Sequence, residues 1–270
     1  MKNDCILLIG HGSRDPEGNP QIERFVEQWR NSQPDWQIEL CFIEFADVEI
    51  EQGLDNVAAK AKRVIVVPLV LNAAGHVRAE IPHHIEHAKA RHLDTSFVYT
   101  PPITAGEPVF SILKNNLQKT VAELHFPAPS NTGVIVLGRG SSDRKANGEI
   151  SKIARWLFEE SEHELVDIAF TGVTTPRLET SVQRQVTLGM KQIVILPLYL
   201  FNGTLIKRIE QQILRLKQQY PEIAFANSSY FGFEDEIKTV LNERVYAVLN
   251  NQQSGEFMDI CPDDHHHHHH

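Results

Sequence analysis

The chain has 270 residues, of which 41% are hydrophobic and 23% charged, an ordinary composition for a globular protein with room for two domains. A formal charge of −9 and the lack of a basic stripe with interleaved aromatic residues argue against nucleic acid as a partner. The longest apolar run, Val64–Leu71, is far too short to span a membrane. The N-terminus has no signal-peptide pattern, so we expect a cytoplasmic protein.

Cysteine usage excludes two further classes. The three cysteines, Cys5, Cys41 and Cys261, are too few and too scattered for a disulfide framework or a zinc site. Cys5 and Cys41 fall in apolar runs, where they are expected to be buried as small hydrophobic residues. Histidines 265–270 look like a purification tag, and setting them aside leaves eight of the 14 histidines.

Short apolar runs alternate with amphipathic segments along the chain. Continuous Val, Ile and Leu runs are typical of parallel strands buried on both faces, and the segments between them have helical spacing. The expected strands are, in chain order, residues 6–9, 38–45, 64–71, 97–99, 134–137, 165–170, 193–200 and 223–226. The pattern predicts an α/β fold of two tandem doubly wound parallel-sheet domains with a cleft between them.

The two halves also match in sequence at a recurring offset of 128 residues, which becomes 129 around Pro68 and Pro197, and this match indicates an internal duplication. The framework residues that recur are glycines, apolar residues and a few polar loop residues; examples are Gly10/Gly138, Gly12/Gly140, Ser13/Ser141, Asp15/Asp143, Asn19/Asn147, Gly75/Gly203 and Ile81/Ile209. We expect an N-terminal domain at 1–125, a linker at 126–132, a C-terminal domain at 133–250 and a tail at 251–270.

Three potential metal ligands lie near the ends of the first three expected strands. His11 directly follows the first strand, Glu44 lies near the end of the second, and His76 comes just after the third. Because the carboxyl ends of parallel strands form the ligand crevice of an open sheet, these side chains can converge on one ion. Two imidazoles and one carboxylate suit a divalent cation such as cobalt, iron, nickel or zinc.

The repeat supports this interpretation. At the same offset, His11, Glu44 and His76 correspond to Arg139, Gly172 and Thr204, none of which would form the same site. The first half would therefore hold the metal, and the second half, with a degenerate site, would close over the substrate. Each residue alone has another interpretation, since a histidine after a strand often forms only loop hydrogen bonds and Glu44 could cap a helix.

Two other motifs are less specific. The glycines around His11 resemble a phosphate loop, but the sequence there has neither the GxGxxG nor the GxxxxGK(S/T) pattern of nucleotide-binding proteins. His83, His84 and His87 follow His76, and His83 and His87 share a helix face that could pass metal inward or could simply be solvated. Pro82 is interpreted as the first position of the helix that carries them.

At these residues the sequence resembles the CbiX/SirB branch of the class II tetrapyrrole chelatases. The resemblance covers residues 3–250 and rests mainly on Gly10-His11-Gly12-Ser13-Arg14, Ile43-Glu44-Phe45-Ala46, Val67-Pro68-Leu69 and Gly75-His76-Val77. It implies that His11 and His76 are catalytic and that they bind metal together with Glu44. Long members can carry an iron–sulfur site in a cysteine-containing tail, but with Cys261 alone we expect none here.

The resemblance implies a lyase-class chelatase that inserts a divalent metal into sirohydrochlorin, a ring with eight carboxylates, for cobalamin or siroheme synthesis. Cobalt is the preferred metal, with iron or nickel as alternatives, and no tightly bound cofactor is expected. The expected substrate contacts are Ser13, Arg14, Arg78 and Arg139, because guanidinium groups pair with carboxylates. The rival function is a non-catalytic metal or tetrapyrrole carrier, and the sequence does not indicate an oligomeric state.

Overall fold

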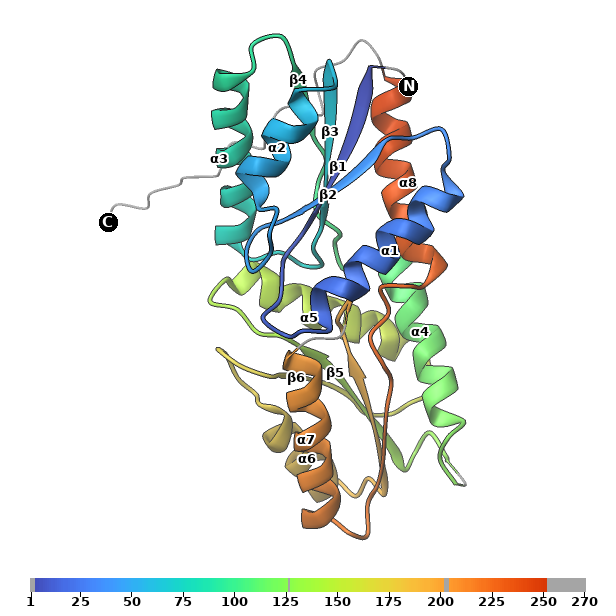
Figure 1. Cartoon of the computed structure of the whole chain (residues 1–270). Coiled ribbons are helices and arrows are strands. Elements are labelled where there is room, and N and C mark those ends of the chain that lie inside the picture. Colours follow the sequence, from blue (N-terminus) through green and yellow to red (C-terminus); the bar gives the residue numbers. More distant parts are fainter. Residues whose placement is uncertain (1–2, 126, 202–203, 252–270) are drawn as a thin grey trace, which may run out of the picture.

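The computed structural model of the chain forms two stacked lobes (Figure 1). It describes residues 3–125, 127–201 and 204–251, apart from the side chains of residues 76 and 204. Cys261 and the terminal histidines therefore lie outside the described residues. Helices and strands alternate strictly along the described chain, which confirms the predicted α/β class.

The first lobe is built on a parallel sheet with the strand order β2-β1-β3-β4. Its strands are β1 (Asp4–Gly10), β2 (Ile38–Phe42), β3 (Arg63–Leu69) and β4 (Ser96–Tyr99). The central strands β1 and β3 are buried along almost their whole length, as their continuous apolar runs require. The intervening helices are α1 (Gly18–Ser32), α2 (Ile50–Ala58) and α3 (Gly75–Arg91).

The second lobe repeats this arrangement, with the strand order β6-β5-β7-β8. Its strands are β5 (Thr132–Gly138), β6 (Val166–Phe170), β7 (Gln192–Pro197) and β8 (Ala224–Asn227). The helices between them are α5 (Arg144–Glu159), α6 (Leu178–Thr187) and α7 (Thr204–Gln219). The identical strand order is what an internal duplication predicts.

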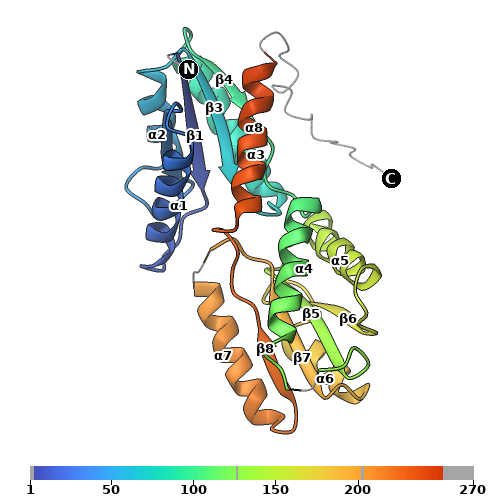
Figure 2. The same ribbon diagram turned by 90° about the vertical axis from the view of Figure 1, so that its right-hand side faces the viewer.

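The last helix of each half packs on the other lobe. Helix α4 (Glu107–Val121) contacts β7, β8 and α5 of the second lobe, whereas α8 (Asp235–Asn250) contacts β3 of the first. Figure 2 shows α8 alongside the first sheet and α4 along the second. The Trp29 indole N–H in α1 donates to Asn242 of α8 at 2.8 Å, which fixes this exchange on the first-lobe side.

Each sheet is therefore covered on both faces. Helices α2 and α3 cover one face of the first sheet, and α1 and α8 cover the other. In the second lobe α6 and α7 cover one face, and α4 and α5 cover the other. The faces under α1 and α8 and under α4 and α5 belong to one continuous apolar cluster, so the two lobes share a core.

The prediction that a helix begins at Pro82 is wrong. Pro82 lies inside α3, which begins seven residues earlier at Gly75. A proline removes one backbone donor and normally ends a helix or sits in its first turn. Here the apolar residues on both sides of it, Val77, Ile81 and Ile85, are all buried against the sheet, and this packing outweighs the local cost.

Two other expectations are answered directly. Cys5 and Cys41 are free and completely buried, as predicted, and burial raises the pKa of their thiols to about 11 and about 12, respectively. Within the described part of the chain, no helix combines the length and the apolar character needed to cross a membrane.

Candidate metal and substrate site

The loops after β1 and β2 meet at the carboxyl edge of the first sheet. Gly10, the last residue of β1, pairs in register with Phe42, the last residue of β2. The pairing continues into the loops, because the Ile43 N–H donates to the Gly10 carbonyl at 3.0 Å and the Glu44 N–H donates to the His11 carbonyl at 3.3 Å. His11 and Glu44 are therefore held side by side by main-chain bonds.

Gly12 allows this close approach. Its φ of +90° is rarely adopted by residues with a side chain, and a Cβ at this position would lie only 1.8 Å from the Glu44 carbonyl oxygen. A glycine is thus required after His11 for two reasons: the turn needs a positive φ, and the two loops lie too close together for a side chain.

The His11 and Glu44 side chains point toward one another. His11 Nδ1 lies 3.8 Å from Glu44 Oε1, and the side chains are 31% and 46% exposed. This separation is too long for a hydrogen bond. It is shorter than two consecutive metal–ligand bonds of about 2.1 Å each, so one ion can contact both groups. His11 Nδ1 also lies 3.3 Å from the Gly12 carbonyl oxygen, to which it can donate only when it carries the ring proton, so metal binding through Nδ1 requires that proton to be on Nε2.

His76 is placed only by its backbone. It is the second residue of α3, whose first residue, Gly75, follows an extended Ala74. Its side chain lies outside what the structure describes, so its role as the third ligand stays a prediction. Among the described side chains, no three histidines, cysteines or acidic residues gather as a metal site.

The second lobe preserves the loop framework without the proposed ligands. The Ser13 N–H donates to Asn19 Oδ1 at 2.9 Å, and the Ser141 N–H donates to Asn147 Oδ1 at 3.0 Å. Gly140, like Gly12, has a φ of +90°, and a Cβ there would lie 1.9 Å from the Gly172 carbonyl oxygen. The duplication has thus kept the geometry of the loop while the residue types at the ligand positions differ.

A cleft of about 240 Å³ lies between the lobes at this edge. His11 and its duplication partner Arg139 both line it, together with the loop that leads into α3 and the first turns of α5. Asn72 crosses the cleft and donates from Nδ2 to the Ala146 carbonyl at 2.9 Å. A larger groove of about 830 Å³ lies between α1 and the edge strand β2, but neither His11 nor Glu44 lines it.

The predicted substrate contacts occupy different environments. Arg139 is exposed in the cleft. Arg14 is exposed beside the His11 loop, with its guanidinium carbon 4.5 Å from the centre of the Phe45 ring. Arg78 is exposed in the first turn of α3. The Ser13 hydroxyl accepts from the Asp15 N–H at 3.0 Å, so it helps to shape the loop.

A salt bridge ties the His11 loop to the second lobe. Lys207 of α7 lies 3.1 Å from the carboxylate of Asp15, whose side chain is only 3% exposed. The backbone N–H of Glu17 and the ammonium group of Lys207 lower the pKa of Asp15. The carboxylate therefore stays charged, and it links α7 to the loop that carries His11.

Sequence reasoning missed two apolar residues at the carboxyl edges of the sheets. Phe45 and Val173 are equivalent positions of the repeat, both have positive φ, and they are 41% and 70% exposed. Val173 lines the cleft. Positive φ is strained for such residues and tends to occur at functional loops. The signal in the sequence was that an apolar residue occupies the same position in both halves of the repeat.

The chain is similar to several known proteins. The sequence profile of the CbiX family matches residues 5–120 and 133–248. A sirohydrochlorin cobaltochelatase of Priestia megaterium is 42% identical over 244 residues, covering 88% of this chain and 78% of the relative. A sirohydrochlorin ferrochelatase of the same organism is 28% identical over 250 residues, covering 92% of each chain.

A solved structure has the same fold. SirB from Bacillus subtilis with Fe³⁺ superposes with a TM-score of 0.77 at 28% identity, covering 93% of this chain and 97% of SirB. Both lobes are included in that match, and each half of the sequence matches the family profile separately. The chain is therefore a two-lobed member of the CbiX family.

Proposed function

We propose that this chain is a metal chelatase that inserts a divalent ion, cobalt by preference, into sirohydrochlorin. The observation that carries the proposal is the approach of His11 Nδ1 to Glu44 Oε1, 3.8 Å apart at the edge of the interlobe cleft. In a chain whose relatives are sirohydrochlorin chelatases, this pair supplies the two kinds of group that metal insertion needs. Both the metal and the tetrapyrrole are substrates.

The chemistry has two requirements. The ion must lose bound water, and the two pyrrole N–H groups of the ring must lose their protons. A histidine whose unperturbed pKa is near 6.5 can bind metal as the neutral imidazole and can also accept a proton at neutral pH. We assign both roles to His11 and His76, and we assign charge-balancing ligation to Glu44.

The tetrapyrrole would enter between the lobes. Its carboxylates would meet Arg139 on the second-lobe side and Arg14 and Arg78 on the first, against an overall formal charge of −9. Specific ligand pockets usually measure about 300–1,000 Å³. The cleft, at about 240 Å³, is below that range, so we infer that the ring extends beyond the cleft.

Cobalt is favoured over iron by sequence similarity. The cobaltochelatase of Priestia megaterium shares 42% identity with this chain, compared with 28% for the ferrochelatase of the same organism. The ligand types do not decide between the two metals, because imidazole and carboxylate bind both.

The test is to incubate the protein, without residues 265–270, with sirohydrochlorin and cobalt, iron or nickel, and to follow the absorbance of the ring. We expect many turnovers with cobalt, and we expect His11→Ala and Glu44→Gln to lower the rate by at least about 100-fold. His163→Ala is the matched control, since His163 bonds to the Thr132 carbonyl at the opposite end of β5. Product that stops at one equivalent per chain would instead indicate a carrier.

A further inference from the structure

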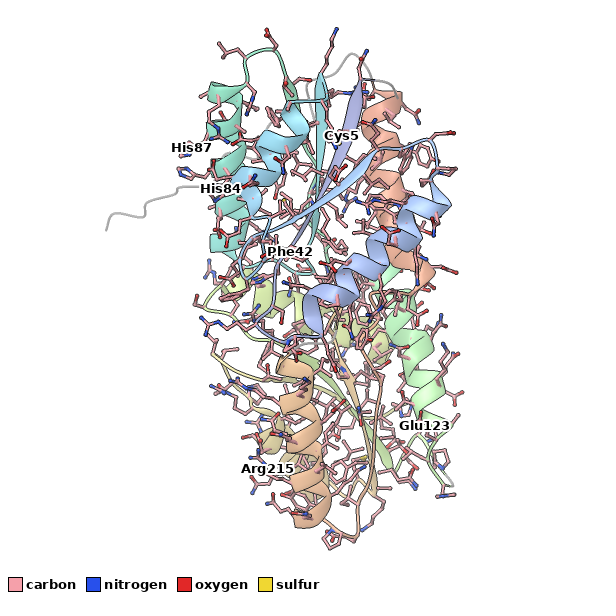
Figure 3. All side chains as sticks on the ribbon, in the orientation of Figure 1. Cys5, Phe42, His84, His87, Glu123 and Arg215 are labelled. Atoms are coloured by element: carbon pink, nitrogen blue, oxygen red, sulfur yellow. The ribbon has the colours of Figure 1, made fainter. Side chains whose placement is uncertain are left out.

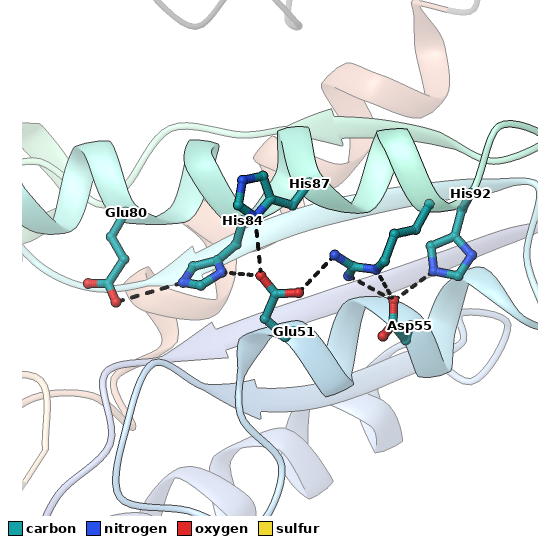
Figure 4. Close-up of polar contacts among 7 residues, drawn as sticks. Glu51, Asp55, Glu80, His84, His87 and His92 are labelled. Carbon is teal, nitrogen blue, oxygen red and sulfur yellow. Dashed lines mark hydrogen bonds and ion pairs between the residues drawn. The ribbon is translucent and has the colours of Figure 1, made fainter.

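A group of histidines and carboxylates lies where α2 meets α3, outside the cleft. Figure 4 shows histidines of α3 and its C-terminal end facing carboxylates of α2. Figure 3 shows His84 and His87 on the outer side of the first lobe, along α3. The residues of this surface, here called the α2–α3 patch, are Glu51, Asp55, Glu80, His83, His84, His87, Arg91 and His92.

The ring of His84 is held by a carboxylate of α2. Its Nδ1 lies 2.6 Å from Glu51 Oε1, a short hydrogen bond that holds the ring in place. When Nδ1–H donates to Glu51, the lone pair is on Nε2. A carboxylate that orients a histidine in this way is the usual outer partner of a metal-binding imidazole.

A second possible metal ligand, the carboxylate of Glu80, lies near Nε2, the other ring nitrogen of His84. Glu80, four residues earlier on the same face of α3, has its Oε1 3.9 Å from His84 Nε2. This distance is beyond hydrogen bonding, but one ion with bonds of about 2.1 Å can contact both atoms. The side chains of His84 and Glu80 are 22% and 39% exposed, so an ion from solution can reach them.

We propose that Glu80 and His84 form a second binding site for a divalent transition-metal ion, with Glu51 orienting His84. Two protein ligands leave the remaining positions of the ion to water. This agrees with the described side chains, among which no three such groups gather as a metal site. A site of this kind exchanges its ion more readily than a three-ligand site, which suits uptake and release.

The position of the site along α3 gives it a role in delivery, and this part rests on the proposed function. Residues 76, 80 and 84 are spaced four apart, so their backbone positions follow one face of the helix. A rise of 1.5 Å per residue separates successive positions by about 6 Å. The second site is thus about two turns from His76, and Glu80 lies between them.

Cobalt titration calorimetry of the protein without residues 265–270 tests the second site. The wild-type chain should bind two Co²⁺ ions, and His84→Ala and Glu80→Gln should each lose one. Glu51→Gln should lower the affinity for that ion by about 10–100-fold, the usual effect of removing a residue that hydrogen-bonds to a metal ligand. His92→Ala is the matched control, because His92 also pairs with a carboxylate of α2, Asp55, at 2.7 Å. It should retain both ions.

Three results would overturn the proposal: His84→Ala keeps both ions, His92→Ala loses one, or His83→Ala removes the ion instead. The last would place the site on the His83–His87 pair, whose ring centres are 4.3 Å apart. His11→Ala separates this proposal from the cleft site, since it should lose the other ion and keep the one at Glu80 and His84.

The delivery role has its own readout. At limiting Co²⁺, we expect the initial rate of metal insertion by His84→Ala to be about tenfold below that of His92→Ala. Equal rates for the two variants would remove the delivery role while leaving the binding result intact.

Discussion

Substituting alanine for Gly12 tests whether the spacing of the two loops positions the site. The added Cβ would lie 1.8 Å from the Glu44 carbonyl oxygen, whereas real Cβ contacts essentially never fall below 3.0 Å. The loops must therefore move apart by roughly an ångström, which separates His11 from Glu44. The positive φ adds about 1–3 kcal/mol of strain for a residue with a side chain.

A displacement of about 1 Å at a reacting centre can lower a rate about 100-fold. We therefore expect Gly12→Ala to lower kcat for cobalt insertion by about that factor, and to lower the free energy of unfolding by at least about 1–3 kcal/mol. The assays are ring absorbance under saturating substrates and urea unfolding followed by circular dichroism.

Two other glycines serve as matched controls. Gly140→Ala meets the same strain in the second lobe, so it should lose similar stability but less than about tenfold in rate, because no proposed metal ligand is displaced. Gly148 is exposed within α5, with nothing within 4 Å of an added Cβ, and its alanine variant should gain about 0.5–1 kcal/mol at full activity. If Gly12→Ala turns over at the wild-type rate, the reasoning about loop spacing is refuted.

Three further predictions concern stability. The pKa of Asp15 is lowered in the folded chain, so its contribution to the free energy of unfolding is present above the unfolded pKa of about 3.9 and is lost as the pH falls through the folded pKa. Asp15→Asn should therefore reduce the loss of stability with falling pH on the acid side, and an unchanged pH dependence would contradict this. Because α4 and α8 are exchanged, calorimetry should give one unfolding transition for both lobes, and two resolved transitions would count against a shared core. Leu113→Ala, in α4, removes a completely buried side chain and should cost about 2–5 kcal/mol in urea unfolding, so a cost below about 1 kcal/mol would mean that α4 packs loosely.

Strand composition explains how much of the fold could be predicted. The runs around Ile6–Ile9 and Val64–Leu71 are apolar at every position, which is typical of strands in a sheet covered on both faces. The internal repeat, with its recurring offset between the halves, then predicted equivalent lobes. The position of the proposed ligands followed from general topology, because parallel strands bring their carboxyl ends to one edge.

The exchange of α4 and α8 could not be predicted in the same way. An amphipathic pattern such as Val109, Phe110, Leu113 and Leu117 indicates that one helix face is buried, but it does not indicate which sheet covers it. Two equivalent lobes with equivalent apolar faces can accept either helix. The predicted domain boundaries, with the first domain ending at residue 125 and the second beginning at residue 133, remain predictions.

The approach of the loops at the site could not be predicted from the sequence either. The approach of the Gly12 and Glu44 loops depends on backbone angles that a glycine permits but does not dictate. Phe45 and Val173 have positive φ against their own preference, which reflects the surrounding loops and not the local sequence.

The proposed function depends on a single cation held between first-lobe side chains at the cleft. Anomalous diffraction from crystals of the tag-free protein soaked in Co²⁺ locates that ion directly. We predict a peak about 2.0–2.2 Å from a ring nitrogen of His11 and from a carboxylate oxygen of Glu44, with His76 completing the ligands. Cobalt bound elsewhere on the chain, with none between His11 and Glu44, would contradict the account.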